Sequence, residues 1–122
     1  MEDKRQLDKL EYGEVNISNE VIGIIAGLAA KEVSGVVGMN SSIGVEISEI
    51  FGKKIYNKGV KIEIDNDNAI TVNLNLVIDY GIVISEICSK IQQNVKKSIE
   101  TMTEMEVLAI NINIQGIKQD VE

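Results

Sequence analysis

The sequence predicts an α+β fold: a single two-layer domain whose helices pack on one face of a mixed or mostly antiparallel sheet. Residues 72–81 and 107–114 each alternate apolar and polar side chains, which is the period of a strand with one buried face. Residues 82–102, which lie between them, carry apolar side chains at helical spacing. A chain of 122 residues, 44% hydrophobic and 25% charged, has the size and composition of one folded domain.

The N-terminal part of the chain predicts a strand, a helix and a second strand. Residues 14–17 alternate and predict a short strand. Ser18 or Asn19 can cap the helix that follows, because both side chains accept a hydrogen bond from a free backbone N–H. We expect this helix to end at Gly35 and a strand to follow at residues 36–39. Its apolar face would consist of Val21, Ile24, Ile25, Leu28 and Ala29.

The middle of the chain predicts a short helix and a β-hairpin. Residues 40–58 contain apolar side chains at helical spacing, bounded by glycines. Residues 60–64 alternate, residues 65–68 (DNDN) have the composition of a turn, and residues 70–80 alternate again. The buried face of the second hairpin strand would carry Ile70, Val72, Leu74, Leu76, Ile78 and Tyr80.

The C-terminal part predicts the second main helix and the last strand, which completes the order β-α-β-(α)-β-β-α-β. The helix would bury Ile84, Ile87, Cys88, Ile91, Val95, Ile99 and Met102. The last strand would bury Leu108, Ile110, Ile112 and Ile114. On this helix Cys88 is best interpreted as a small core residue rather than a nucleophile.

The residue types exclude several kinds of catalytic or metal site. The chain has no histidine and one cysteine, so it cannot form a Ser-His or Cys-His pair, an ordinary zinc site or an intrachain disulfide. The DNDN turn begins like a calcium loop, but Ala69 and Ile70 stand where an oxygen ligand and a glycine belong. We therefore assign no catalytic, cofactor-binding or metal-binding residue.

Nucleic acids and membranes are also poor partners by sequence. The formal net charge of −7 opposes binding to a nucleic acid or to an anionic membrane surface. Residues 35–38 (GVVG) match the bare GxxG string of KH domains, but the two valines offer neither charge nor side-chain donors. The longest apolar run, residues 21–30, is about half as long as a membrane-spanning helix.

One polar surface stands out in the predicted sheet. Its face away from the helices would carry Thr71, Asn73, Asn75, Asn111 and Asn113. Asparagine is disfavoured in strands. This face is either an ordinary solvated surface or a surface for self-association or for a protein partner, and the residues alone leave both interpretations open.

Several short segments, taken in order, resemble the alkaline shock protein family, also called the Gls general-stress family. Each motif is weak by itself, whereas their order and spacing are specific. Residues 32–39 (EVSGVVGM) resemble the family's EV-x-GV-x-GM segment, and residues 58–63 (KGVKIE) resemble its KGVKVE stretch. Residues 79–81 (DYG), 91–96 (IQQNVK) and 110–112 (INI) resemble its EYG, IQ-x-x-VK and VNV elements.

The resemblance covers nearly the whole chain, with two departures. It implies a domain at residues 12–117, between a flexible N-terminal segment at 1–11 and a short tail at 118–122. Members often carry proline after the YG element, and this chain has none there. Many have Gly-Leu where this chain has Glu104-Met105, which affects the end of the helix.

The resemblance implies a non-enzymatic bacterial protein of the envelope stress response. Some members are soluble but held at the membrane by a separate small membrane protein. Another branch is linked to fatty-acid synthesis through acetyl-CoA carboxylase. We therefore expect a cytoplasmic protein that binds protein partners and is recruited to the membrane by an anchor protein. A regulatory binding module for a lipid-synthesis enzyme is the alternative, and a nucleic-acid binder with a KH-like loop is a third, less favoured one. Neither a cofactor nor direct membrane insertion is expected.

Overall fold

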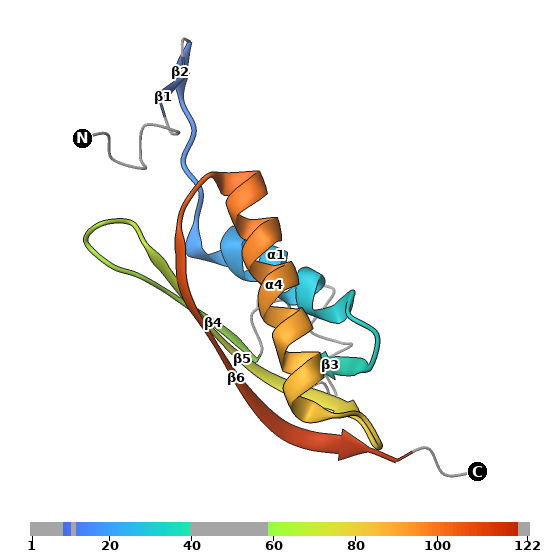
Figure 1. Cartoon of the computed structure of the whole chain (residues 1–122). Coiled ribbons are helices and arrows are strands. Elements are labelled where there is room, and N and C mark those ends of the chain that lie inside the picture. Colours follow the sequence, from blue (N-terminus) through green and yellow to red (C-terminus); the bar gives the residue numbers. More distant parts are fainter. Residues whose placement is uncertain (1–8, 11, 40–58, 120–122) are drawn as a thin grey trace.

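The computed structural model describes residues 9–10, 12–39 and 59–119, and it contains two layers (Figure 1). Helices α1 (Asn19–Lys31) and α4 (Ile84–Thr103) cover one face of a four-stranded mixed sheet. The strands of this sheet are β3 (Val36–Met39), β4 (Val60–Ile64), β5 (Ile70–Asp79) and β6 (Val107–Lys118). The predicted α+β class is confirmed. The helix predicted within residues 40–58 lies outside the described residues.

Strand β5 is the centre of the sheet. β6 pairs with it in parallel along its whole length, from Ile70 opposite Val107 to Asp79 opposite Lys118. On its other side β4 and β3 pair antiparallel with successive halves of β5. Helix α4 connects β5 to its parallel neighbour, which is the crossover that such a pair requires. β6 therefore forms one border of the described sheet.

The predicted first strand is not part of this sheet. Among the described strands, β2 (Gly13–Glu14) pairs only with β1 (Lys9–Leu10), and residues 15–17 are not in a strand. The alternation at residues 14–17 is too short to fix a strand without a partner. It leads instead into the cap of α1, where the Ser18 hydroxyl accepts a hydrogen bond of 3.1 Å from the Val21 N–H.

Helix α1 differs from its prediction in its end and in its buried face. It stops at Lys31, and Gly35 lies in the following turn with φ +104°, a conformation that favours glycine. Small side chains let this helix pack closely, so its buried residues include Ile22, Ile25, Ala26, Ala29 and Ala30. Val21 and Leu28, predicted to be buried, are 45% and 51% exposed.

The β4–β5 hairpin confirms the predicted turn. One Asp65 carboxylate oxygen accepts the N–H groups of Asp67 at 2.8 Å and Ala69 at 3.0 Å. Asn68 adopts φ +63°, a conformation that asparagine tolerates. In β5 the predicted core residues from Ile70 to Ile78 are buried, but Tyr80 is exposed because the strand ends at Asp79.

Helix α4 buries a stripe with a spacing of four residues. Ile87, Ile91, Val95, Ile99 and Thr103 are buried, whereas the predicted core residues Ile84 and Met102 are exposed. Cys88 is only partly buried, packed against the core. Thr103 continues the stripe because its hydroxyl donates to the Ile99 carbonyl at 2.7 Å and accepts the Met105 N–H at 3.1 Å.

Strand β6 contains two bulges, and the first overturns one predicted core residue. The register advances from Ile70–Val107 to Thr71–Ala109, so Leu108 is an extra residue and is 57% exposed. Val107 takes the buried position instead, and Ile110 is buried as predicted. A second extra residue, Gln115, lies between the pairs Leu76–Ile114 and Val77–Gly116.

Candidate interaction surface

The face of the sheet opposite the helices gathers the five polar residues singled out from the sequence. Alternate residues of β5, including Val72, Leu74 and Leu76, have no solvent exposure because they point toward the helices. Neighbouring side chains in a strand point to opposite faces. Thr71, Asn73 and Asn75 therefore lie on the outer face, half-buried by their neighbours. Asn111 and Asn113 of β6 are exposed beside them.

The asparagines form a ladder of side-chain amides across β5 and β6. The parallel register places Asn111 beside Asn73 and Asn113 beside Asn75. The Asn111 amide donates to the Asn73 side-chain oxygen at 3.0 Å, and the Asn113 amide donates to that of Asn75 at 3.1 Å. We call Thr71, Asn73, Asn75, Asn111 and Asn113 the amide face. Such cross-strand pairs each contribute about 0.2–1 kcal/mol to the stability of a sheet.

Gln115 extends this surface, although the sequence did not single it out. Its side-chain amide donates to the Asn75 oxygen at 3.3 Å, so that oxygen accepts two bonds. The sequence places Gln115 beyond the predicted end of the last strand. Only the alternation of Asn111, Asn113 and Gln115 could have suggested that the polar row continues.

Charges border the amide face on β4. Lys61 pairs with Asn73 and Glu63 with Thr71 in the strand register. The Lys61 ammonium lies 3.5 Å from a Glu63 carboxylate oxygen, and both side chains are mostly exposed. Such an ion pair contributes little to stability. The face thus combines neutral hydrogen-bonding groups with one balanced pair of charges, which suits contact with a polar protein surface.

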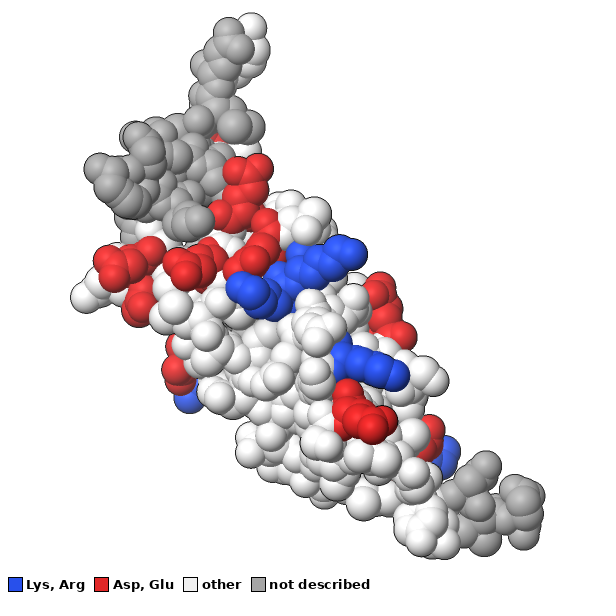
Figure 2. All heavy atoms as spheres, viewed as in Figure 1, with Lys and Arg blue, Asp and Glu red and all other residues white. Residues whose placement is uncertain are grey.

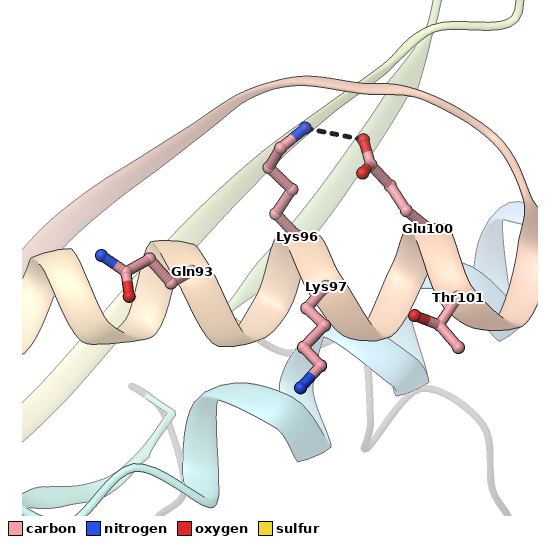
Figure 3. Close-up of a pocket in the computed structure, with 5 residues that line it drawn as sticks. All are labelled: Gln93, Lys96, Lys97, Glu100 and Thr101. Carbon is pink, nitrogen blue, oxygen red and sulfur yellow. Dashed lines mark hydrogen bonds and ion pairs between the residues drawn. The ribbon is translucent and has the colours of Figure 1, made fainter.

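A hollow of about 470 Å³ on α4 offers no comparable chemistry (Figure 3). Its lining comes from one helix, and Lys96 and Glu100 already form an ion pair of 2.7 Å there. The same Glu100 oxygen accepts the Val107 N–H at 3.0 Å, so this carboxylate holds the start of β6. On the side of the molecule shown in Figure 2, charged side chains are mixed in sign, and the lower part is largely uncharged.

The other candidate motifs have structural roles. Val36 and Gly38 of the GxxG string belong to β3 and pair with β5, so the string forms part of a strand rather than a phosphate clamp. A Cβ at Gly35 would lie 2.8 Å from the Ile87 side chain, which shows close packing at the first glycine. Burial raises the pKa of the Cys88 thiol, which lowers its reactivity.

The described residues contain no group of three or more cysteine, aspartate or glutamate side chains arranged to hold a metal ion. Neither of the described helices is long and apolar enough to cross a membrane.

Comparison with known proteins gives a family and several relatives. The model of the alkaline shock protein 23 family, described as having a cell envelope-related function, matches residues 8–119. The uncharacterized proteins YqhY and YloU of Bacillus subtilis are 37% and 32% identical to this chain over 117 and 112 residues. These alignments cover 96% and 90% of this chain, and 86% and 92% of the relatives.

A more distant relative carries a functional name. A Streptococcus pyogenes protein named as a stress response regulator gls24 homolog is 25% identical over 107 residues. The alignment covers 87% of this chain and 59% of that protein. No solved structure matches the chain.

Proposed function

The chain belongs to the alkaline shock protein 23 family, whose function is cell envelope-related, and from this premise we propose that it is a non-enzymatic protein of the envelope stress response. It acts in the cytoplasm by binding protein partners, and one partner recruits it to the inner side of the membrane. The name of the gls24 homolog supports the link to stress. The family is not a known enzyme family.

The observation that carries this proposal is the amide face. Its asparagine side chains lie on an outer surface of the sheet, with Asn111 and Asn113 exposed to solvent. Each amide has both donor and acceptor capacity, and the ladder uses only part of it. Capacity that remains can form hydrogen bonds to a protein partner. The formal net charge of −7 supports recruitment by a protein rather than direct adsorption on anionic lipid.

A binding experiment tests this surface directly. The variant Asn73→Lys with Asn111→Lys places two charges on the amide face. The variant Gln93→Lys with Thr101→Lys adds the same charge to an exposed side of α4 and is the matched control. Tagged proteins are expressed in the native host, and bound proteins are identified by mass spectrometry. We expect a membrane protein to be recovered with the wild type and the control, and lost with the amide-face variant.

The result also separates the proposal from its alternatives. Recovery of carboxylase subunits in place of a membrane protein would favour the regulatory role in lipid synthesis. Equal recovery by both variants would remove the amide face from the proposal. A strain that lacks the gene should grow more slowly than its parent under alkaline or cell-wall stress, and unchanged growth under both stresses would refute the envelope role. Circular dichroism must first show that each variant is folded.

A further inference from the structure

The outer edge of β6 has the features of an interface. β6 is 12 residues long and pairs with β5 on one side, and no described strand lies on its other side (Figure 1). Its sequence, VLAININIQGIK, contains no proline and no charge before Lys118. Natural proteins usually protect exposed edges with charges, prolines or bulges. Here the bulges stand near the two ends, and the segment between them, residues 109–114, is regular.

The backbone groups that point away from β5 along this edge can be assigned to particular residues. The Glu106 carbonyl points toward β5, because it accepts the Ile70 N–H at 2.8 Å. The bulge at Leu108 shifts the alternation by one, so Asn111 and Asn113 direct their backbone groups to β5 and Ile112 directs its groups outward. The second bulge restores the first pattern, which agrees with the bond of 2.9 Å from the Tyr80 N–H to the Lys118 carbonyl.

By the same assignment, the backbone N–H and C=O groups of Ile110 and Ile114 also point away from β5. A side chain of α4 supports it, because the Gln92 amide donates to the Ile110 carbonyl at 3.0 Å. That oxygen has a second lone pair and can accept another bond. Ile110, Ile112 and Ile114 therefore present three pairs of backbone groups along the edge.

We propose that this edge pairs antiparallel with the same edge of a second copy of the chain, about a two-fold axis at Ile112. Residues 110–114 (INI followed by NI) read the same in both directions, so the segment is a palindrome that matches itself in this register. Ile112 then faces its own copy, Ile110 faces Ile114, and Asn111 faces Asn113. Each of the isoleucine pairs exchanges two backbone hydrogen bonds across the interface.

Charge complementarity supports this register over its neighbours. Counting outward from the two-fold axis places Lys118 of one copy opposite Glu106 of the other. The bulges preserve this alignment, because each strand contains one extra residue between the axis and the charged pair, Leu108 in one copy and Gln115 in the other. Both Glu106 and Lys118 are exposed and free to meet. A register centred one residue away would place an asparagine on the axis and would lose this pairing of charges.

The dimer would extend both layers of the protein. A two-fold axis perpendicular to the sheet keeps the helices of the two copies on the same side. The amide ladders of the copies would join through Asn111 and Asn113 to form one continuous polar face. This pairing does not rest on the proposed envelope function, and each can fail without the other.

The oligomeric state of the full chain gives the first test. Sedimentation equilibrium should show a particle of twice the chain mass of 13.4 kDa. Ile112→Pro removes the outward N–H on the axis without removing a bond to β5, whereas Ile112→Ala keeps that N–H and is the matched control. We expect the proline variant to weaken dimerisation at least tenfold more than the alanine variant. A monomeric wild type, or equal dimerisation by the two variants, would overturn the proposal.

Cysteine pairing tests the register. In a Cys88→Ser background, Asn111→Cys and Asn113→Cys are prepared as separate proteins. Facing residues of this type have Cα atoms about 4.5 Å apart, within the range that a disulfide spans. A mixture of the two proteins should form a disulfide-linked dimer on oxidation, and neither protein alone should do so. Self-linking of the Asn111→Cys protein, or no link in the mixture, would refute this register.

A charge swap tests the ends of the interface. Lys118→Glu places two carboxylates opposite each other and should weaken the dimer several-fold. Adding Glu106→Lys to the same chain should restore it, because the charges again have opposite sign. Failure of the double variant to recover while it remains folded would contradict the proposed pair.

Discussion

The end of α4 predicts that glycine in place of Glu104 makes the protein more stable. Glu104 caps this helix with φ 61° and ψ 18°, in the left-handed region. A residue with a Cβ costs about 1–2 kcal/mol there, and glycine avoids that cost. The Glu104 carboxylate also lies at the negative end of the helix dipole, and the last turn contains no basic residue. That repulsion costs about 0.3–1 kcal/mol.

The entropic cost of introducing glycine is smaller than the sum of the backbone strain and the charge repulsion that it removes. Glycine increases the conformational freedom of the unfolded chain, which lowers stability by about 0.4–1 kcal/mol. The free energy of unfolding should therefore rise by about 1 kcal/mol in Glu104→Gly, which corresponds to an increase in Tm of about 4 °C. Urea and thermal unfolding, followed by circular dichroism, measure both quantities.

Two further variants separate the backbone effect from the charge effect. Glu104→Gln removes the charge and keeps the Cβ, so it should gain only the electrostatic part. Glu104→Lys places a favourable charge at the helix end and should be slightly more stable than the glutamine variant. If the glycine variant is no more stable than the glutamine variant, the left-handed backbone at this position is not a source of strain and the reasoning is refuted.

Three other predictions follow from buried or bonded groups. Thr103→Val should lower the free energy of unfolding by about 1–3 kcal/mol, because the Met105 N–H loses its acceptor. Urea unfolding of Thr103→Ser, which keeps the hydroxyl, is the control and should show a smaller loss. Asp65→Ala should lower the free energy of unfolding by about 1–2 kcal/mol in the same assay, because two turn N–H groups lose their acceptor. Asp65→Asn, which retains an oxygen, should cost less. Cys88 should react with iodoacetamide at pH 8 more slowly in the folded protein than in urea, because its raised pKa leaves less thiolate. Equal rates would contradict that interpretation.

The sequence correctly predicted which strand side chains are buried wherever the strand is regular, because there the direction of a side chain depends only on the local backbone. Alternation along β5 identified Val72, Leu74 and Leu76 as core residues, and all three are fully buried. It failed at Leu108, because a bulge arises from pairing with β5 and leaves no local signature in apolar residues.

Helix faces were less predictable, because burial depends on what packs against the helix. In α1, alanines rather than the larger Val21 and Leu28 face the interior, so weighting residues by hydrophobicity selected the wrong side. In α4, the buried stripe continues at Thr103 rather than Met102. A threonine can occupy that position because its hydroxyl finds both a donor and an acceptor nearby.

The candidate surface could be predicted as a set of residues but not as a network. Alternation alone was enough to place Asn111 and Asn113 on the face opposite the helices. Their bonds to Asn73 and Asn75 depend on the parallel register of two strands joined by α4. That register is fixed by the crossover and by the bulge, neither of which a single-strand pattern contains.

Stability does not explain why four asparagines occupy the centre of this face. Preferences for strand residues span about 1 kcal/mol, and asparagine is among the disfavoured types. Each cross-strand pair of the ladder stabilises the sheet by about 0.2–1 kcal/mol. Threonine at these positions would have a higher strand preference and could also form cross-strand hydrogen bonds. A surface selected for folding alone would therefore favour threonine, and the amides agree with the contacts to another protein chain that we propose for this face.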